Sequence, residues 1–160
     1  MPTPQFILDL REQVGHALLF LNGVTAVVFD RREDPGRVLL GQRADNGRWR
    51  LLGGILEPGE QPAPGMAREV FEETGVTVEI DRLVSVITLP PAEYPNGDKV
   101  QFLSCTFRAH YVSGDAHVAD DESLAVGWYD LDQLPEELPQ RDRDVISQAL
   151  PLEGGPDFVR

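Results

Sequence analysis

Hydrophobic residues follow two different spacings along the chain, and each spacing predicts one kind of secondary structure. In residues 6–18 they recur every four positions, at Phe6, Leu10, Val14 and Leu18, which predicts a helix. Residues 23–29 are almost continuously apolar and rich in β-branched side chains, which predicts a buried strand. Further strands are predicted at residues 38–40, 76–89 (one or two strands), 100–112 and 128–129, and further helices at residues 131–134 and 142–150.

Turn residues separate these elements along a chain that is long enough for one domain. Asp34-Pro35-Gly36 predicts a hairpin between the first two strands, and Asn46-Gly47 predicts another turn before residues 49–55. Strands before and after a central helix, with another helix near the C-terminus, predict an α/β fold with a mixed sheet covered on both faces. We expect a single domain over residues 1–160, with an N-terminal helix in residues 1–20 and a loose tail at residues 151–160.

Three carboxylates are predicted to project from a single turn of the central helix. Glu69, Glu72 and Glu73 are spaced i, i+3 and i+4, so a helix would place all three on one face. Like charges at this spacing repel one another, whereas a hard divalent cation such as Mg²⁺ takes oxygen ligands and works beside substrate phosphates. The spacing therefore favours a metal site over the alternative, an acidic amphipathic helix on the surface.

The residues around these carboxylates form a longer pattern. Residues 54–76 read GILEPGEQPAPGMAREVFEETGV, and they match the Nudix signature, G-x5-E-x7-R-E-U-x-E-E-x-G-U with U apolar, at every specified position. Residues 49–54 resemble the W-x-L-P-G-G approach of the same family, with Leu52 in place of the proline. The chain thus resembles a Nudix (MutT-like) hydrolase, and this resemblance implies an α/β/α sandwich with a mixed β-sheet.

The resemblance also implies a role for the specified residues. Glu69, Glu72 and Glu73 would bind Mg²⁺, or Mn²⁺ in its place, and the Gly53 carbonyl is a further ligand by family analogy. A second set, Glu60 and Arg68, looks like a supporting pair that fixes the loop before the helix against the helix itself.

The general base stays open between two carboxylates. Glu73 could serve, but in many relatives the base comes from the loop before a late strand, and in this chain residues 120–122 (Asp-Asp-Glu) form that loop. Within this loop of three acidic residues Glu122 is our choice for the base, and the alternative is that the loop is an ordinary solvated acidic turn. Ala125 stands where relatives often carry a further glutamate, which removes one candidate ligand.

Residues outside the signature suggest how a substrate would be held. Arg43 and Arg50 could meet phosphates, because the planar arginine side chain makes paired hydrogen bonds to phosphate oxygens, although solvated arginines are the alternative. Trp49 could stack on a base, although a place in the core is the commoner role of tryptophan. Family patterns associate a proline about 15 residues after the signature with ADP-ribose, and a tyrosine about 18 residues after it with dinucleoside polyphosphates. This chain has Pro91 and Tyr94 at those places, so the two clues cancel. Turn residues surround Tyr94, and this turn could cap the substrate pocket and let Tyr94 contact the substrate, with a simple hairpin loop as the alternative.

Composition narrows the class of partner. The net charge of −13 argues against a nucleic-acid polymer, because proteins that bind one carry basic patches. The longest apolar stretches are far shorter than a membrane span, and the N-terminus lacks the basic start and uninterrupted apolar core of a signal peptide. The single cysteine, Cys105, cannot form an internal disulfide. We therefore expect a cytoplasmic protein that acts on a small phosphorylated substrate away from membranes, and a homodimer is a family-level expectation.

The leading hypothesis is a Mg²⁺-dependent enzyme that hydrolyses the pyrophosphate linkage of a nucleoside diphosphate derivative. Its substrate would be a (d)NTP or a molecule like ADP-ribose, with water attacking phosphorus. Two alternatives remain open: a Nudix-fold sensor that binds a nucleotide without hydrolysing it, and a hydrolase of a non-nucleotide diphosphate. The complete set of signature carboxylates argues against the sensor.

Overall fold

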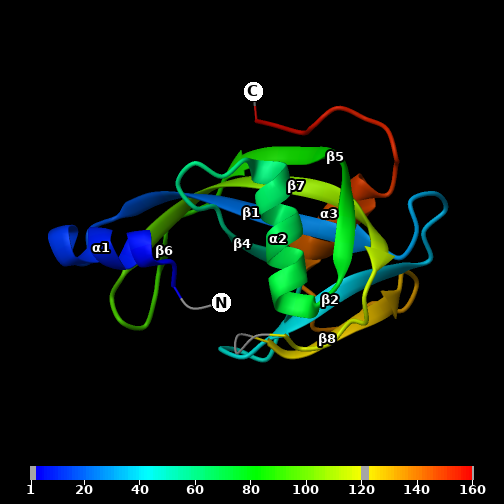
Figure 1. Ribbon diagram of the computed structural model, residues 1–160, viewed down its shortest axis with the longest axis horizontal. Coiled ribbons are helices and arrows are strands. Elements are labelled where there is room, and N and C mark those ends of the chain that lie inside the picture. The colour runs from blue at the N-terminus through cyan, green and yellow to red at the C-terminus, as the bar shows by residue number, and fades with distance from the viewer. Residues whose placement is uncertain (1–2, 120–122, 160) are drawn as a thin grey trace.

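A mixed sheet of eight strands and three helices make up the part of the chain that the computed structural model describes, residues 3–119 and 123–159 (Figure 1). The strands are β1 (Leu19–Phe29), β2 (Arg37–Arg43), β3 (Trp49–Arg50), β4 (Leu52–Ile55), β5 (Thr77–Thr88), β6 (Ala92–Glu93), β7 (Lys99–Ser113) and β8 (Ser123–Asp130). The helices are α1 (Gln5–Val14), α2 (Pro62–Thr74) and α3 (Gln140–Ala149).

Two long strands form the centre of the sheet. The strand order is β3-β2-β1-β7-β5, while β4 pairs with β1, β6 with β7 and β8 with β2. Strands β1 and β7 run parallel, from Leu19 opposite Val100 to Phe29 opposite His110. The remaining strand pairings are antiparallel. A parallel pair needs a long crossover connection, and α2 lies within the segment that connects β1 to β7.

Helices cover both faces of the sheet, which confirms the fold class predicted from the sequence. Successive residues of a strand point to opposite faces. Val24 of β1 packs in one core with Val70 of α2, whereas Val27 of β1 packs in a second core with Ile146 of α3. The two helices therefore lie on opposite faces, and in Figure 1 α2 crosses in front of the sheet while α3 lies behind it.

Helix α2 carries the signature carboxylates, and its ends follow from its sequence. Gln61 is the N-cap in an extended conformation, and Pro62 occupies the first turn, where a missing N–H costs no intrahelical hydrogen bond. Gly75 ends the helix in the left-handed conformation, with φ of 70°, and its N–H donates to the Phe71 carbonyl.

Two of the predicted helices differ from the structure. The N-terminal helix ends at Val14 rather than at residue 18, because Gly15 takes a positive φ of 57° and residues from Leu19 onward join the sheet. The predicted helix at residues 131–134 was wrong, since these residues form a turn in which the Gln133 N–H donates to the Asp130 carbonyl (2.9 Å). A proline at position 135 disfavours the helical conformation just before it.

The C-terminal segment is held against the sheet at one residue. Asp157 donates its N–H to the Val84 carbonyl (2.8 Å), and its own carbonyl accepts from the Val86 N–H (3.0 Å). This segment therefore extends the edge of the sheet beside β5 at Asp157, where a loose tail was expected. Two-residue strand β6 is a further addition, in a region where the sequence predicted only a turn.

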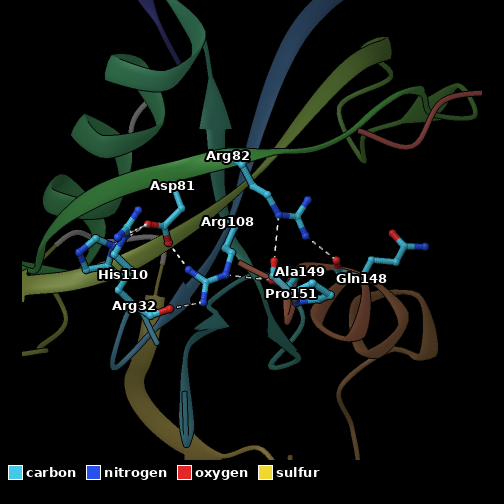
Figure 2. A network of polar contacts seen from close by, with 8 residues as sticks. All are labelled: Arg32, Asp81, Arg82, Arg108, His110, Gln148, Ala149 and Pro151. Carbon is cyan, nitrogen blue, oxygen red and sulfur yellow. Dashed lines mark hydrogen bonds and ion pairs between the residues drawn. The ribbon is translucent and has the colours of Figure 1, made fainter. Parts of the chain in front are cut away.

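A buried arginine joins the sheet to the C-terminal helix (Figure 2). Arg108 of β7 is fully buried and pairs with Asp81 of β5. Its guanidinium also donates to the carbonyls of Ala149 (3.0 Å) and Arg32 (2.7 Å). Asp81 in turn lies 3.2 Å from Arg32 Nε and 3.0 Å from His110 Nδ1. Because buried charges are tolerated only when they are paired and hydrogen-bonded, this network ties the end of α3 to β5 and β7.

Candidate active site

Glu69 lies against the backbone of the second glycine of the Gly53-Gly54 pair. Its side chain comes from α2 and is only 1% exposed. Gly54 lies in β4 opposite Val24 of β1, whose side chain packs with α2. A side chain at position 54 would therefore also point toward α2. The Glu69 carboxyl group occupies the space that a Cβ at position 54 would need. Glycine is therefore required at position 54 because a strand backbone and a carboxyl group approach each other there.

Burial changes the protonation of the Glu69 carboxyl. Removal from water raises its pKa to about 7, against the opposing effect of the Arg68 guanidinium, and the neighbouring charges of Glu72 and Glu60 add to the rise. Nη2 of Arg68 lies 3.0 Å from the Glu69 Oε1. Near neutral pH this carboxyl can therefore exchange a proton for a cation at low cost, which is the behaviour of a metal ligand.

Arg68 connects carboxylates from the loop and the helix. Its Nε and Nη2 donate to the two oxygens of Glu60 at 2.7 and 2.9 Å, and its Nη1 donates to Glu72 Oε2 at 2.9 Å. These hydrogen bonds hold the pKa of the Glu60 carboxyl below its usual value. Gly65 leaves room for this arrangement, because a Cβ there would lie 2.8 Å from the Glu60 carboxyl carbon. The structure thus brings Glu60 and Arg68 together as expected, while their role in catalysis stays a prediction.

Asp142, which the sequence analysis did not single out, holds the segment that leads to the glycine pair. It lies in α3, is 5% exposed, and its Oδ2 accepts from the Arg50 Nε (2.9 Å) and from the Leu51 N–H (3.3 Å). The residues it contacts lie 91 and 92 positions earlier in the chain. Neither spacing nor composition points to such a pair, so only the folded chain reveals it.

Residues predicted to bind phosphate or a base have partners inside the protein. Arg43 donates to both oxygens of Asp45, at 2.9 and 2.8 Å. Trp49 packs edge to face on Tyr129, with ring centroids 4.8 Å apart, in the core beneath α3. Arg50 is held by α3, as described above. The predicted binding roles of these three side chains stay predictions.

The site residues predicted from the sequence and not yet described do not lie together. Glu73 is partly buried on α2, and its backbone carbonyl accepts from the Ala119 N–H at 3.2 Å. Tyr94 lines a cavity beneath α1. Glu122, our choice for the general base, lies outside the described residues.

The chemistry of the donor set suits a hard divalent cation. Glu60, Glu69 and Glu72 all pair with the guanidinium of Arg68. Three carboxylates therefore share one positively charged side chain. Within residues 3–119 and 123–159, no three His, Cys, Asp or Glu side chains already stand as a metal-binding group. Carboxylates on one helical turn, one of them buried with a raised pKa, are nevertheless the oxygen ligands that Mg²⁺ or Mn²⁺ prefers.

Comparison with known proteins decides the family. The model of the NUDIX domain matches residues 20–149, which include α2, α3 and all of the sheet except Leu19, the first residue of β1. The chain belongs to the Nudix family. Members of this family are hydrolases of phosphorus-containing anhydrides and generally need a divalent metal ion, so this Nudix protein is an enzyme of that class.

Two relatives and one solved structure show how far the likeness extends. A MutT-like protein of Streptomyces ambofaciens is 42% identical over 131 residues, which are 81% of this chain and 76% of that protein. The NAD-capped RNA hydrolase NudC of Salmonella schwarzengrund (strain CVM19633) is 40% identical over 111 residues, 68% of this chain but only 39% of NudC. The crystal structure of a MutT Nudix hydrolase from Burkholderia pseudomallei is 30% identical, covers 81% of this chain and 98% of its own, and superposes with a TM-score of 0.64. The chain therefore spans well under half the length of NudC.

These matches confirm the α/β/α Nudix fold that the signature implied. No helix among the described residues combines the length and the apolar character needed to cross a membrane.

Proposed function

We propose that this Nudix protein is a Mg²⁺-dependent hydrolase that cleaves the pyrophosphate linkage of a nucleoside diphosphate derivative, a (d)NTP or a molecule like ADP-ribose. The observation that carries the proposal is the buried carboxyl of Glu69, packed on Gly54 and sharing Arg68 with Glu60 and Glu72. Burying a carboxylate is costly unless a cation compensates it, so this cluster suits the binding of a metal ion beside substrate phosphates.

Each carboxylate on α2 then has a defined task. Glu69, Glu72 and Glu73 would hold Mg²⁺, or Mn²⁺ in its place, together with the Gly53 carbonyl. When bound, the ion would neutralise charge on phosphate oxygens and lower the pKa of a water molecule. Arg68 would keep the carboxylates around it in position, because its fork of donors has a fixed geometry.

The reaction that we propose is simple hydrolysis. The oxygen of water forms a bond to one phosphorus, the bond from that phosphorus to the bridging oxygen breaks, and the bridging oxygen leaves with the other phosphate. A carboxylate accepts the proton that water loses. We assign this step to Glu122, with Glu73 as the other candidate.

The substrate class rests on charge and on relatives. A net charge of −13 favours a small phosphorylated molecule over a polymer. The likeness to the NAD-capped RNA hydrolase NudC adds NAD, whose pyrophosphate joins two nucleosides, to the compounds worth testing. Arg43, Arg50 and Trp49 remain predicted contacts to the substrate, and a cytoplasmic location and a homodimer remain predictions of the sequence.

A panel assay tests the proposal directly. Phosphate release is measured on (d)NTPs, ADP-ribose, NAD, nucleoside diphosphate sugars and dinucleoside polyphosphates, with a coupling phosphatase, in Mg²⁺, in Mn²⁺ and in EDTA. We expect turnover of one class that depends on the metal and falls at least 100-fold in Glu69→Gln and in Glu73→Gln. Glu79→Gln, an exposed glutamate on β5, is the matched control and should keep full activity.

The outcomes separate the hypotheses. Metal-independent turnover, or full activity in Glu69→Gln, would contradict the assignment of the carboxylates. A parent protein that binds one of these nucleotides tightly but hydrolyses none of the panel would support the sensor. Equal turnover of diphosphates with and without a base would support a hydrolase of non-nucleotide diphosphates.

A further inference from the structure

Residues 114–119, which follow β7 and which we call the clasp, run along the C-terminal end of α2. The Ala119 N–H donates to the Glu73 carbonyl (3.2 Å), and the His117 N–H donates to the Thr74 carbonyl (3.1 Å). Figure 1 shows this segment, in yellow, passing the lower end of α2. The last four carbonyls of a helix have no partner within the helix, so the clasp satisfies two of those of α2.

The side chain of His117 holds the clasp on the residue that ends α2. Its ring occupies the space that a Cβ of Gly75 would need, so the imidazole packs directly against the backbone at the helix end. Nδ1 of the ring lies 2.7 Å from the carbonyl oxygen of Asp115, which can only accept, so Nδ1 donates and the ring keeps this orientation. His117 therefore contacts α2 with both its backbone and its side chain.

Small residues let the clasp approach α2 this closely. Gly114 has a φ of 98°, and a Cβ there would collide with the Gly75 carbonyl oxygen. Ala116 packs against the same core as Val70 of α2. The Tyr111 hydroxyl donates to the Gly114 carbonyl (3.1 Å), which joins the clasp to β7. The clasp is thus anchored on β7, in the core and on the end of α2.

The clasp holds the turn of α2 that carries Glu73. One turn earlier Glu69 is positioned by its burial against β4, and the guanidinium of Arg68 positions Glu72. Glu73 lies in the last turn of the helix, and its own backbone carbonyl is one of the two that the clasp binds. Because the ends of helices fray, a side chain in the last turn depends on such outside contacts for its position.

We propose that the clasp sets the position of the Glu73 carboxylate, with His117 and Gly114 as positioning residues that act through the last turn of α2. The inference rests on the proposed function, in which Glu73 binds a metal ion or accepts a proton. It adds residues that lie outside the signature, and their effect on metal binding can be measured without turnover.

The first test is Mn²⁺ binding to the full chain, with free Mn²⁺ counted by electron paramagnetic resonance. His117→Ala removes the ring from Gly75, and Gly114→Ala inserts a Cβ against the Gly75 carbonyl. Both should weaken Mn²⁺ binding by about tenfold or more, the usual effect of residues that support metal ligands. Two matched controls should bind Mn²⁺ as the parent does. Val118→Ala trims a 41% exposed side chain of the same clasp, and Gly47→Ala adds a Cβ at a φ of 68° where nothing lies within 4 Å.

A double-mutant comparison shows whether the clasp acts through Glu73. In the Glu73→Gln background His117→Ala should not weaken Mn²⁺ binding further, because the carboxylate whose position it sets is already gone. In the background of Glu79→Gln, an exposed residue of β5, the full effect should remain. A general loosening of the fold would act equally in both backgrounds, so this comparison separates positioning from stability.

Kinetics on the best substrate of the panel complete the test. In His117→Ala at saturating Mg²⁺, kcat and kcat/KM should fall together by about tenfold or more, with KM within about twofold of the parent value. This pattern is expected because Glu73 acts on the reacting phosphate and not on the rest of the substrate.

The outcomes separate this inference from the proposed function. Normal Mn²⁺ binding and normal kcat in folded His117→Ala and Gly114→Ala, with a parent that hydrolyses a nucleotide, would overturn the inference and leave the hydrolase standing. An equal effect of His117→Ala in the Glu73→Gln and Glu79→Gln backgrounds would also overturn it. Mn²⁺ binding that depends on the clasp, in a protein without hydrolysis, supports the inference and refutes the hydrolase instead.

Discussion

At the scale of single residues, Gly54 and Glu69 decide how the site is built. The signature predicts both residues, but it does not say that they touch. In the structure the Glu69 carboxyl fills the space beside the Gly54 backbone, so the strand and the helix can approach only if position 54 has no side chain. The same contact buries the carboxyl and raises its pKa to about 7.

Replacing Gly54 with alanine should lower kcat/KM about 100-fold, because a displacement of roughly 1 Å in a catalytic group costs about that much. Steady-state kinetics on the best substrate of the panel measures the effect. Gly155→Ala is the matched control, because a Cβ there meets nothing within 4 Å, and it should behave as the parent does. An unchanged kcat/KM in Gly54→Ala would show that the position of Glu69 is not critical.

At the scale of elements, polar side chains fix how neighbouring segments of the fold are joined. Asp142 does this between α3 and the segment before β4. Asp30 does it in the hairpin of β1 and β2, where its Oδ1 accepts from the N–H groups of Gly36 and Arg37 at 3.0 Å each. Burial acts to raise the pKa of the Asp30 carboxyl, but these hydrogen bonds outweigh it and the pKa lies below its usual value.

The hairpin contact should therefore stabilise the protein in a pH-dependent way. Because the pKa of Asp30 is lower in the folded chain, its contribution is complete above the unfolded value of 3.8 and is lost as the pH falls through the folded value. Asp30→Asn should lower the free energy of unfolding by about 1 kcal/mol at pH 6 and by less at pH 3. Urea unfolding of both proteins at the two pH values measures this, and a difference that does not change with pH would contradict the assignment.

At the scale of the whole molecule, a charged network connects strands β5 and β7 to the C-terminal end of α3. Arg108 reaches Asp81 across the sheet and the Ala149 carbonyl at the end of α3. Arg82 adds hydrogen bonds to the carbonyls of Gln148 (2.8 Å) and Pro151 (3.0 Å), as Figure 2 shows. The network therefore positions α3, whose other end carries Asp142, the residue that binds Arg50 and Leu51 just before β4.

Arg108→Met should lower the free energy of unfolding by about 3–5 kcal/mol, because it leaves the Asp81 carboxylate buried without its main partner. Arg32→Met removes an exposed partner of the same carboxylate and should cost at most about 1 kcal/mol. Denaturant unfolding of the two variants at one pH gives the comparison. Equal effects of the two substitutions would show that burial does not decide the strength of this pairing.

Most elements of the fold could be predicted from the sequence, because their signals are local. Apolar periodicity located the central strands, and the Asp34-Pro35-Gly36 turn located the first hairpin. The errors arose where local signals are weak or mislead. Residues 131–134 have apolar spacing but precede a proline, and β6 has two residues that are ordered only by pairing with β7.

The same distinction between local and long-range signals applies to the candidate site. The sequence by itself determined the family, the fold class and the spacing of Glu69, Glu72 and Glu73, because helix geometry converts that spacing into one face without help from the rest of the chain. Only the tertiary structure decided that Glu69 is buried on Gly54, that Asp142 holds residues 50–51, and that α1 closes a cavity over β4. Each of these depends on segments far apart in the chain meeting in space, and no local pattern encodes the distance at which they meet.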